Sequence, residues 1–401
     1  MSYDVIIVGA GIVGLSTAYK LSLQKPDLRI LVLEKESEVA AHQTGNNSGV
    51  IHSGIYYNPG SYKAKNCVDG RKQLVAFCQE YGVKHDICGK VIVATKEEDI
   101  PRLQAIYERG LQNGIEGIQL IDKEELAEIE PYANGVKAIK VPVTGIVDFK
   151  GVCEKEKELI ESKNGEVMFG AEVTKILHDG NQLIVQTKNA EYKTHYLINC
   201  AGLHCDHVAE SAGYKPPIQI VPFRGEYYEL TPDAEHMVRG LIYPLPNPEF
   251  PFLGVHFTKM VLGGVECGPN AVFAFKREGY NKISFNLNDT IETFQFPGFW
   301  KLAYKHWRMG MGEMYRSFSK QAFLEGLQEL VPSIQSHHIK PAPAGVRAMA
   351  LDPEGEIVDD FYFVKSRNEI HVLNAPSPAA TAGLSLGEEI VKTALKNFEI
   401  V

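Results

Sequence analysis

Three glycines near the start of the chain have the spacing of a phosphate-binding turn. Gly9, Gly11 and Gly14 follow the apolar run 5–8 and precede a segment whose apolar residues recur at helical spacing. In such a strand, turn and helix, Gly9 permits the turn, Gly11 lets the backbone approach a pyrophosphate, and Gly14 lets the helix pack closely on the strand. Because a helix N-terminus also offers free N–H groups and a positive dipole end, the sequence predicts an anion-binding site here.

An acidic residue lies where a dinucleotide needs a hydrogen-bond acceptor. A second apolar run, 29–33, follows the predicted helix and leads into Glu34 and Lys35. Glu34 lies about 20 residues after Gly14, at the position from which such units bind a ribose hydroxyl. A glycine-rich turn alone is weak evidence, and the alternative is a structural βαβ unit with a charged strand end. The added acid favours a dinucleotide site.

The segment 42–60 is dense in glycine and small polar residues. Its second half is too apolar for a simple linker, so we expect a coil that runs along a flat ligand and supplies N–H and hydroxyl groups to phosphates and a ring system. From the turn, the acidic strand end and this coil, the predicted cofactor-binding residues are Gly9, Gly11, Ile12, Val13, Gly14, Glu34, Lys35, Thr44, Asn47, Ser48, Gly49 and Val50.

The length and composition are those of a globular protein with two domains. The chain has 401 residues, of which 44% are hydrophobic and 23% charged. Its net charge of −9, without a strongly basic block, disfavours a nucleic-acid partner. No apolar stretch reaches the roughly 18 residues that cross a bilayer. Seven scattered cysteines without a CxxC pair, and a first strand without a leader before it, favour a cytoplasmic protein.

The stretch from His42 to Gly60, set after the glycine-rich unit, resembles the L-2-hydroxyglutarate oxidase/dehydrogenase family, which are FAD enzymes of the D-amino-acid-oxidase-like superfamily. In one place the chain departs from the family, which usually has His-Asn where this chain has Asn46 and Asn47. A role of that histidine is therefore not transferred. Further matching blocks follow in order over nearly the full length, at 61–65, 88–90, 144–148, 199–203, 221–227, 250–258, 268–271, 276–280, 343–348 and 374–381.

The resemblance implies an α/β fold with a Rossmann-like FAD-binding domain and a second, mixed-sheet substrate domain. We expect the FAD-binding domain to be discontinuous, at 1–80, 145–223 and 342–401, and the substrate domain to occupy 81–144 and 224–341.

Local patterns predict the secondary structure that would build these domains. Segment 289–331 is expected to be helices interrupted at Pro297-Gly298 and at 310–312. Other helices are expected at 97–113, at 148–162 and within 374–393, and strands at 90–94, 166–169, 172–177, 182–187, 196–200, 225–230, 240–244, 252–258, 260–267 and 369–373.

The resemblance also implies FAD contacts outside the first 60 residues. The backbone at Val173 corresponds to the superfamily's adenine contact, and Ala201 and Gly202 resemble a small-residue turn that approaches the dinucleotide. We expect the last loop to bring a helix N-terminus toward the pyrimidine carbonyls of the flavin, where negative charge accumulates on reduction. The predicted contacts in that loop are Ser377, Pro378, Ala379, Ala380 and Thr381.

Oxidation of a C–H bond beside a hydroxyl and a carboxylate requires a hydride acceptor, a base and cations. FAD is the acceptor. Histidine has a suitable unperturbed pKa for the base, and His52 and His256 are the candidates because both lie in blocks that match the family. His52 follows the small-residue coil, and His256 lies on a strand expected to face the flavin. The alternative for either histidine is a hydrogen-bonded packing residue.

For the substrate carboxylates, Arg347 is the preferred candidate. The sequence around it resembles the Gly-x-Arg element with which relatives in the superfamily hold a carboxylate, and a guanidinium binds such a group through two parallel hydrogen bonds. The alternative is a surface or interdomain salt bridge. A dicarboxylate needs a second anchor, for which the unranked candidates are Arg224, Lys276, Arg277, Tyr57 and Tyr243.

Two further clusters could have functions but have simpler explanations. The residues Cys200, His204, Cys205, Asp206 and His207 are metal-ligand types, but their spacing matches no usual zinc pattern, and we predict no metal. The aromatic and methionine residues Phe299, Trp300, Tyr304, Trp307, Met309 and Met314 are expected to pack in the core or at a domain interface, the alternative being a membrane-docking face.

The preferred hypothesis is FAD-dependent oxidation of L-2-hydroxyglutarate to 2-oxoglutarate, with electrons passed to oxygen or, by peripheral contact with the inner face of a membrane, to quinone. The family resemblance implies this substrate; the residues alone indicate a flavoprotein with an anion-binding pocket. One alternative is an amine, amino-acid or glycerol-phosphate oxidoreductase of the same superfamily, and another is a flavin-binding electron-transfer module. The oligomeric state stays open.

Overall fold

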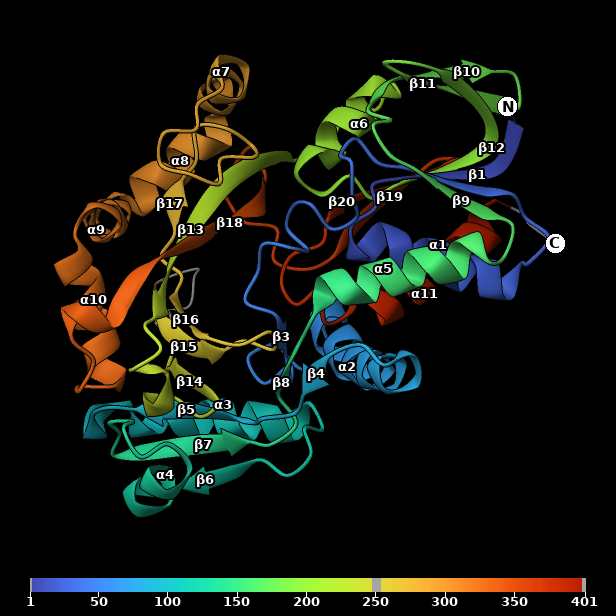
Figure 1. Cartoon of the computed structure of the whole chain (residues 1–401). Helices are drawn as coiled ribbons and strands as arrows, with labels where there is room; N and C mark the ends of the chain where they lie inside the picture. Colours follow the sequence, from blue (N-terminus) through green and yellow to red (C-terminus); the bar gives the residue numbers. More distant parts are fainter. Residues whose placement is uncertain (1, 247–253, 399–401) are drawn as a thin grey trace.

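Two β-sheets, one in each lobe, organise the computed structural model, which describes residues 2–246 and 254–398 (Figure 1). The lobe that holds both termini contains the glycine-rich turn. Of the sequence block at 250–258, the first four residues lie outside the described residues, as does the start of the strand expected at 252–258.

The first sheet is parallel at its centre. β1 (Ser2–Val8) pairs with β2 (Ile30–Leu33) on one side and with β12 (Glu191–Asn199) on the other. All four residues of β2 are buried, as expected for a strand covered on both faces. The remaining strands of this sheet are β9 (Gly165–Met168), β10 (Val173–Asp179), β11 (Gln182–Thr187), β19 (Tyr362–Lys365) and β20 (Glu369–Asn374).

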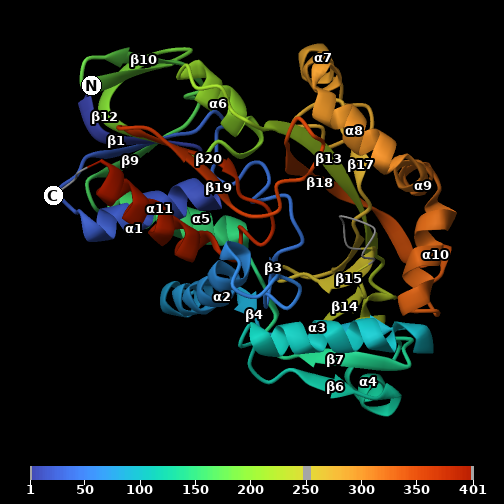
Figure 2. The ribbon, with the colours of Figure 1, turned by 180° about the vertical axis from the view of Figure 1, so that it is seen from behind.

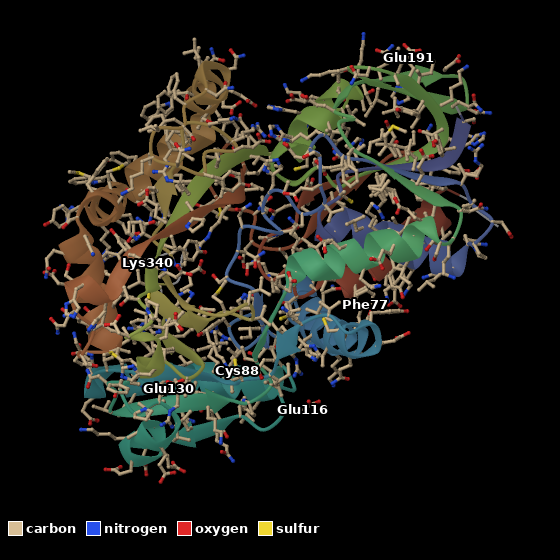
Figure 3. The ribbon with its side chains drawn as sticks, in the orientation of Figure 1. Phe77, Cys88, Glu116, Glu130, Glu191 and Lys340 are labelled. Carbon is tan, nitrogen blue, oxygen red and sulfur yellow. The ribbon has the colours of Figure 1, made fainter. Side chains whose placement is uncertain are left out.

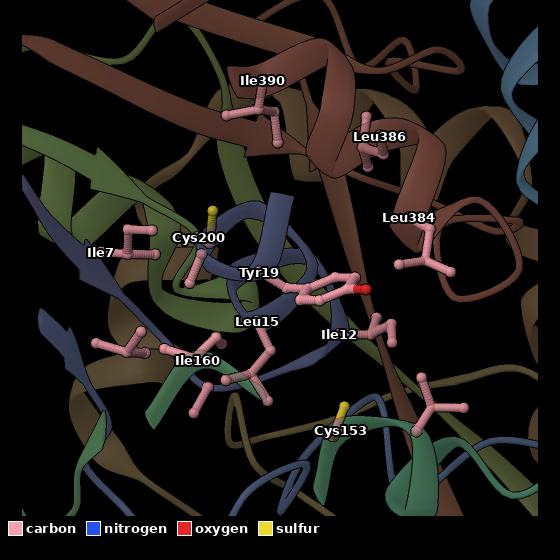
Figure 4. Packing of buried hydrophobic residues seen from close by; sticks show 14 of the residues in the cluster. Ile7, Ile12, Leu15, Tyr19, Cys153, Ile160, Cys200, Leu384, Leu386 and Ile390 are labelled. Carbon is pink, nitrogen blue, oxygen red and sulfur yellow. The ribbon is translucent and has the colours of Figure 1, made fainter. Parts of the chain in front are cut away.

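Helices cover one face of this sheet, and the β10–β11 ribbon with α6 lies on the other (Figures 1 and 2). Leu15 and Tyr19 of the first helix pack among side chains of the last helix and of the sheet (Figure 4). The two helices approach closely because Gly387 has no side chain; a Cβ there would lie 2.7 Å from the carbonyl carbon of Ser16. The helices of this lobe are α1 (Ile12–Gln24), α2 (Tyr62–Tyr81), α5 (Phe149–Glu161), α6 (Cys205–Ser211) and α11 (Gly383–Asn397).

The second sheet is built on a long antiparallel pair, β13 (Gln219–Leu230) and β18 (Ile339–Leu351). Both strands extend from this lobe toward the first sheet (Figure 1). The domain limits expected at 223/224 and 341/342 fall inside these two strands. The other strands of the second sheet are β5 (Lys90–Ala94), β6 (Gln119–Ile121), β7 (Lys137–Val141), β14 (Leu241–Pro244), β15 (His256–Lys259), β16 (Val265–Gly268) and β17 (Val272–Phe273).

Shorter elements fix the edges of this lobe. Glu130, labelled in Figure 3, is buried and accepts hydrogen bonds from the backbone N–H groups of Arg239 (2.9 Å) and Gly240 (2.7 Å), which ties the end of α4 to the start of β14. A small sheet of β3 (Val50–Ile51), β4 (His85–Asp86) and β8 (Gly145–Val147) lies between the lobes, and the helices nearby are α3 (Ile100–Gln112), α4 (Lys123–Ile129) and α10 (Lys320–Leu330).

The helical segment differs from the expectation in its breaks: one expected break is absent, and two unexpected breaks occur at His306 and Ser319. α7 (Leu287–Gln295) does end before Pro297, where α8 (Pro297–Lys305) begins. The break expected at 310–312 is wrong, because α9 (Trp307–Phe318) is continuous through it. A helical glycine costs only about 0.5–1 kcal/mol relative to alanine, which cooperative hydrogen bonding and packing of the rest of the helix can offset.

The packing expected for the aromatic residues of α8 and α9 is only partly confirmed. Phe299 packs against Phe273 as expected. The expectation is wrong for Trp300, which is 54% exposed, and also for Tyr304 (84%), Trp307 (54%) and Met314 (38%). Each helix is amphipathic, and only the face toward β17 and its neighbours is covered, so these side chains lie on the outer face.

Candidate active site

A cavity of about 1400 Å³ lies between the two sheets, with walls from both lobes. It extends from the glycine-rich turn after β1 to the side chains of His52, His256 and Arg347. This volume exceeds the range of about 300–1,000 Å³ that is usual for small-ligand pockets, so the cavity has room for a large ligand.

The glycines of the turn are required by close backbone approaches. Gly9 has a φ of +104°, and a Cβ there would lie 2.6 Å from the carbonyl oxygen of Cys200 at the end of β12. A Cβ on Gly14 would lie 2.0 Å from the carbonyl oxygen of Gly9, so Gly14 lets the helix pack closely on the turn. Gly14 is not among the lining residues of the cavity in the described part of the chain. Gly11, Ile12 and Val13 do line the cavity.

The N-terminus of α1 is open toward the cavity. Its N-cap, Gly11, supplies no side-chain cap, and the first turn contains no acidic side chain. The hydroxyl of Thr44 from the coil accepts a hydrogen bond from the N–H of Ile12 at 3.1 Å. The positive end of the helix dipole therefore faces the cavity without a competing carboxylate on the first turn, which suits a phosphate.

Glu34 and Lys35 line the cavity near this turn. The Glu34 carboxylate accepts the N–H groups of Ala10 (2.8 Å) and Glu36 (3.0 Å), and each oxygen keeps a second lone pair for a ligand hydroxyl. Lys35 forms an ion pair with Glu278, which comes from the second lobe. Burial raises the pKa of Glu278, but hydrogen bonds from His204 and Lys35 outweigh it and hold that pKa below its usual range.

The coil after β2 is held in place by its own asparagines. The amide of Asn46 donates to the carbonyl oxygens of Ala41 (2.9 Å) and His42 (2.8 Å), so this residue supports the coil. The Asn47 amide oxygen accepts the N–H of Gly49, which has a φ of +64°. Asn47, Ser48 and Val50 line the cavity, while Gly49 is not among the lining residues of the described chain.

The coil is also anchored to the other segments of the site. Thr381, which is buried, accepts a hydrogen bond from the N–H of His52 (3.0 Å) and donates one to the carbonyl oxygen of Val50 (3.1 Å). A Cβ on Gly345 would lie 2.6 Å from the carbonyl oxygen of Asn46, so β18 runs close to the coil. The other predicted cofactor contacts that line the cavity are Val173, Ala201, Gly202, Ser377, Pro378, Ala379 and Ala380.

The two candidate bases lie at the same end of the cavity. The Nδ1–H of His256 donates to the carbonyl oxygen of Gly254 at 2.9 Å, which leaves Nε2 with its lone pair. The centroid of the His256 ring lies 4.0 Å from that of the Tyr243 ring. Burial, followed by nearby positive charge, lowers the pKa of both His52 and His256 to about 3. Both rings are therefore neutral near pH 7 and able to accept a proton.

Arg347 lines the same end of the cavity. It lies on β18 opposite Phe223 of β13. Burial raises the pKa of the neighbouring Tyr227, while the charge of Arg347 and a hydrogen bond with it act in the opposite direction. Tyr227 thus contributes to the position of the guanidinium, and it also lines the cavity.

Comparison with known proteins agrees with this arrangement. The family model of the FAD dependent oxidoreductases matches residues 4–393. The L-2-hydroxyglutarate dehydrogenase of Indibacter alkaliphilus is 52% identical over 99% of this chain and 100% of its own length, and the mitochondrial human enzyme is 45% identical over 100% and 90%.

The chain belongs to the L-2-hydroxyglutarate dehydrogenase family of FAD-dependent oxidoreductases. The family suggested by the sequence is confirmed. Solved structures show the same fold: the L-alpha-glycerophosphate oxidase of Mycoplasma pneumoniae, described with FAD bound, has a TM-score of 0.81 at 23% identity and covers 100% of this chain and 96% of its own. The glycine oxidase of Geobacillus kaustophilus has a TM-score of 0.74 at 15% identity over 98% and 95%.

The residues of the cavity fit the FAD of this family. The open end of α1 and the glycine turn suit its pyrophosphate, and the free lone pairs of Glu34 suit a ribose. The small-residue coil leaves a surface against which a ring system can lie.

Two of the candidate second anchors, Tyr57 and Tyr243, line the cavity. The other three candidates, Arg224, Lys276 and Arg277, are not among its lining residues in the described part of the chain. Arg224 pairs with Glu226 at 2.8 Å, and Arg277 pairs with Asp206 and Glu292. Lys276 lies in the same block as Glu278, and it is Glu278 that reaches the cavity wall. The buried arginines are therefore engaged in ion pairs within the protein and hold its segments together.

Two clusters bring metal-ligand types together. Atoms of Asp206, His207 and Glu292 lie within 4.8 Å of one another, but Arg277 donates to both of these carboxylates. In the cluster of Glu36, His42 and Glu278, Lys35 pairs with both glutamates. Since a side-chain cation already contacts both carboxylates of each cluster, we assign neither cluster to a metal.

The sequence interpretation missed Lys90. Its ammonium group lies 4.7 Å from the ring centroid of Tyr56 and 4.8 Å from that of Tyr243, both of which line the cavity. One signal was present in the sequence. The strand 90–94 is otherwise apolar, which is typical of a buried strand, and lysine is almost never fully buried without a partner.

Gly11→Val is expected to give colourless protein. The added side chain would project beside Thr44, whose hydroxyl would already lie 3.2 Å from a Cβ, and into the cavity where we expect the pyrophosphate. Visible flavin absorbance per protein measures the occupancy. The matched control is Gly312→Val in α9, where nothing lies within 4 Å of an added Cβ. Full flavin occupancy in Gly11→Val would show that the pyrophosphate lies elsewhere.

Proposed function

We propose that this chain oxidises L-2-hydroxyglutarate to 2-oxoglutarate with FAD. The observation that carries the proposal is the convergence of Arg347 with two neutral histidines at one end of the cavity. The relatives, at 45–52% identity over nearly the full chain, are named for this substrate, which supports the same substrate here.

The side chains have separate roles in this proposal. Arg347 holds the carboxylate beside the reacting carbon, because its planar guanidinium can donate two parallel hydrogen bonds. Either His52 or His256 accepts the proton of the substrate hydroxyl. Bound FAD supplies the acceptor for the hydride of the α-carbon. The Nε2 of His256 is oriented by the hydrogen bond from its Nδ1–H to the carbonyl oxygen of Gly254. Within the described residues, the ring of His52 makes no hydrogen bond, and only its backbone is engaged.

We further propose that the protein acts in the cytoplasm and passes electrons to quinone by resting α8 and α9 on the membrane. In the described part of the chain, every helix is too short or too polar to span a bilayer. Segment 297–320 has an exposed aromatic face, with Trp300, Tyr304 and Trp307 outward. It contains five lysines and arginines and one glutamate, in a chain of net charge −9. Such a basic and aromatic face suits an anionic lipid surface.

Anaerobic stopped-flow reduction tests the substrate and Arg347 together. L-2-hydroxyglutarate should bleach the flavin of the parent protein, whereas glycine and glycerol 3-phosphate should not. Arg347→Lys keeps a positive charge but loses the planar fork, so substrate binding should weaken by about 1.5–3 kcal/mol, roughly ten- to a hundredfold. The exposed Arg367→Lys is the matched control. Normal binding and reduction in Arg347→Lys would place the carboxylate site elsewhere.

The base is identified by the pH dependence of flavin reduction. One of the two variants His52→Gln and His256→Gln should remove the base. In that variant the rate of flavin reduction should fall roughly a hundredfold or more, while substrate binding stays nearly unchanged. The loss should diminish at high pH, where hydroxide substitutes. In the parent protein the histidines stay neutral until pH falls toward about 3, so they should produce no acid limb near pH 6.5. Parental rates in both variants, judged against exposed His195→Gln, would exclude both histidines.

Membrane contact is tested with vesicles of phosphatidylglycerol that contain quinone. They should raise turnover above that seen with oxygen alone. Trp300→Asp with Trp307→Asp should remove this stimulation and leave anaerobic flavin reduction intact, because both side chains are exposed. Leu23→Asp, at a residue of α1 that is 46% exposed, is the control on the other lobe. Equal loss of stimulation and of anaerobic reduction would mean that the tryptophans serve the fold.

A further inference from the structure

Lys90 is a buried lysine without a carboxylate partner in the described part of the chain. The residue is 3% exposed, and the one neighbour that raises the pKa of its ammonium group is the thiol of Cys67. Burial of a charge costs free energy unless the charge is compensated. A structure that keeps an uncompensated lysine beside this cavity has a positive charge available for a ligand.

The pairing of β5 with β14 explains where this lysine points. The two strands are parallel, with Val91 opposite Ile242 and Ile92 opposite Tyr243. Because side chains alternate along a strand and paired residues share a face, Lys90 and Ile92 point to the same side as Tyr243. The ammonium group consequently lies 4.8 Å from the centroid of the Tyr243 ring and 4.7 Å from that of Tyr56. These contacts with aromatic faces compensate part of the charge.

The two tyrosine rings form a wall between Lys90 and the cavity. Both line the cavity at the end that also holds His52, His256 and Arg347. The positive charge of Lys90 acts on that end of the cavity. Burial is the main cause that lowers the pKa of both histidines, and the charge of Lys90 lowers it further. Lys90 and Tyr243 are both buried, so the charge is only weakly screened along this path.

The other buried cations around this end have partners. Lys63 lines the cavity and pairs with Asp359 at 2.8 Å. Arg71, near Cys67, lies 3.8 Å from Glu116. Within the described residues, Lys90 therefore differs from Lys63 and Arg71 in having no counter-ion.

We propose that Lys90 is the second cation of the substrate site: it attracts the carboxylate remote from the reacting carbon and so selects dicarboxylates over monocarboxylate hydroxy acids. This inference rests on the proposed function, in which Arg347 holds the first carboxylate. Lys90 acts across the wall of Tyr56 and Tyr243, whose hydroxyls can contact the ligand. It takes the place that the sequence left open among Arg224, Lys276, Arg277, Tyr57 and Tyr243.

The proposal predicts a link between binding and proton uptake. Burial lowers the pKa of Lys90 to about 7 in the ligand-free protein, and a bound dianion raises it. Above pH 7, binding must therefore take up a proton, and affinity falls as pH rises. The titratable groups that face Lys90 are Tyr56, Tyr243, Cys67, His52 and His256, of which the tyrosines and the thiol have raised pKa values and the histidines lowered ones.

One carboxyl close to this wall titrates in the same range. Burial raises the pKa of Glu266 to about 7, and its charge affects Tyr243. A bound dianion would raise that pKa as well, so Glu266 could also take up a proton. The variant Glu266→Gln separates the two contributions, because it removes the carboxyl and leaves Lys90 in place.

The selectivity experiment compares L-2-hydroxyglutarate with L-2-hydroxybutyrate, which lacks the remote carboxylate. In anaerobic flavin reduction, Lys90→Met should raise the half-saturating concentration of L-2-hydroxyglutarate at least tenfold and change that of L-2-hydroxybutyrate less than twofold. Lys140→Met on the paired strand β7 is the matched control. An equal effect on both substrates would overturn the proposal, since a merely structural role would weaken both. If Lys90→Met does not retain FAD, Lys90→Gln takes its place.

The binding experiment uses glutarate, a dicarboxylate without the reacting hydroxyl. Calorimetry of the holoenzyme at pH 8 in buffers of different ionisation enthalpy measures proton uptake. The parent protein and Glu266→Gln should take up a proton on Lys90, and Lys90→Met should lose that uptake; equal uptake in Lys90→Met and parent overturns the proposal. If L-2-hydroxyglutarate does not bleach the parent flavin, the proposed function fails. If it does and Lys90→Met is unchanged, only the assignment of Lys90 fails.

Discussion

The close approach of Gly9 to the end of β12 is the constraint on which the cavity depends. Its position, with a φ of +104° and no room for a Cβ beside the carbonyl of Cys200, lets the chain turn directly from β1 into α1. The N-terminus of α1 then faces a space that the coil after β2 encloses. That coil is fixed to β18 by its contact with Gly345 and to the last loop by Thr381, so segments distant in sequence share one wall.

Burial has two opposite uses in this wall. It makes the charged form of a histidine unfavourable, which keeps a ring nitrogen of both His52 and His256 unprotonated near pH 7. It also strengthens the attraction between a cation and an anion, because little water screens them, which favours Arg347 and Lys90 as partners for carboxylates. A pocket that brings neutral histidines and positive charges together suits oxidation of an anionic hydroxy acid.

Much of the site was predictable because it is encoded in short, local patterns. Gly9, Gly11 and Glu34, which the sequence offers as cofactor contacts, all line the cavity, as do Thr44, Asn47 and Ser48 of the coil. Long-range partners could not be read in this way. Arg224 is one of the candidate second anchors in the sequence, yet its guanidinium pairs with Glu226, and only the folded chain shows that ion pair. The exposed Trp300 and Trp307 likewise depend on which face of a helix the neighbouring elements leave uncovered.

The sequence by itself determined the nucleotide-binding unit, the family and the set of candidate groups, because glycine spacing, strand periodicity and contiguous motifs act over a few residues. The tertiary structure decided which of those groups meet. The register between β5 and β14 brings Lys90 to Tyr243, and the pair of β13 and β18 carries Arg347 to the cavity from the far lobe. Such contacts join residues more than a hundred positions apart, and their geometry follows from sheet pairing and packing, which no local pattern specifies.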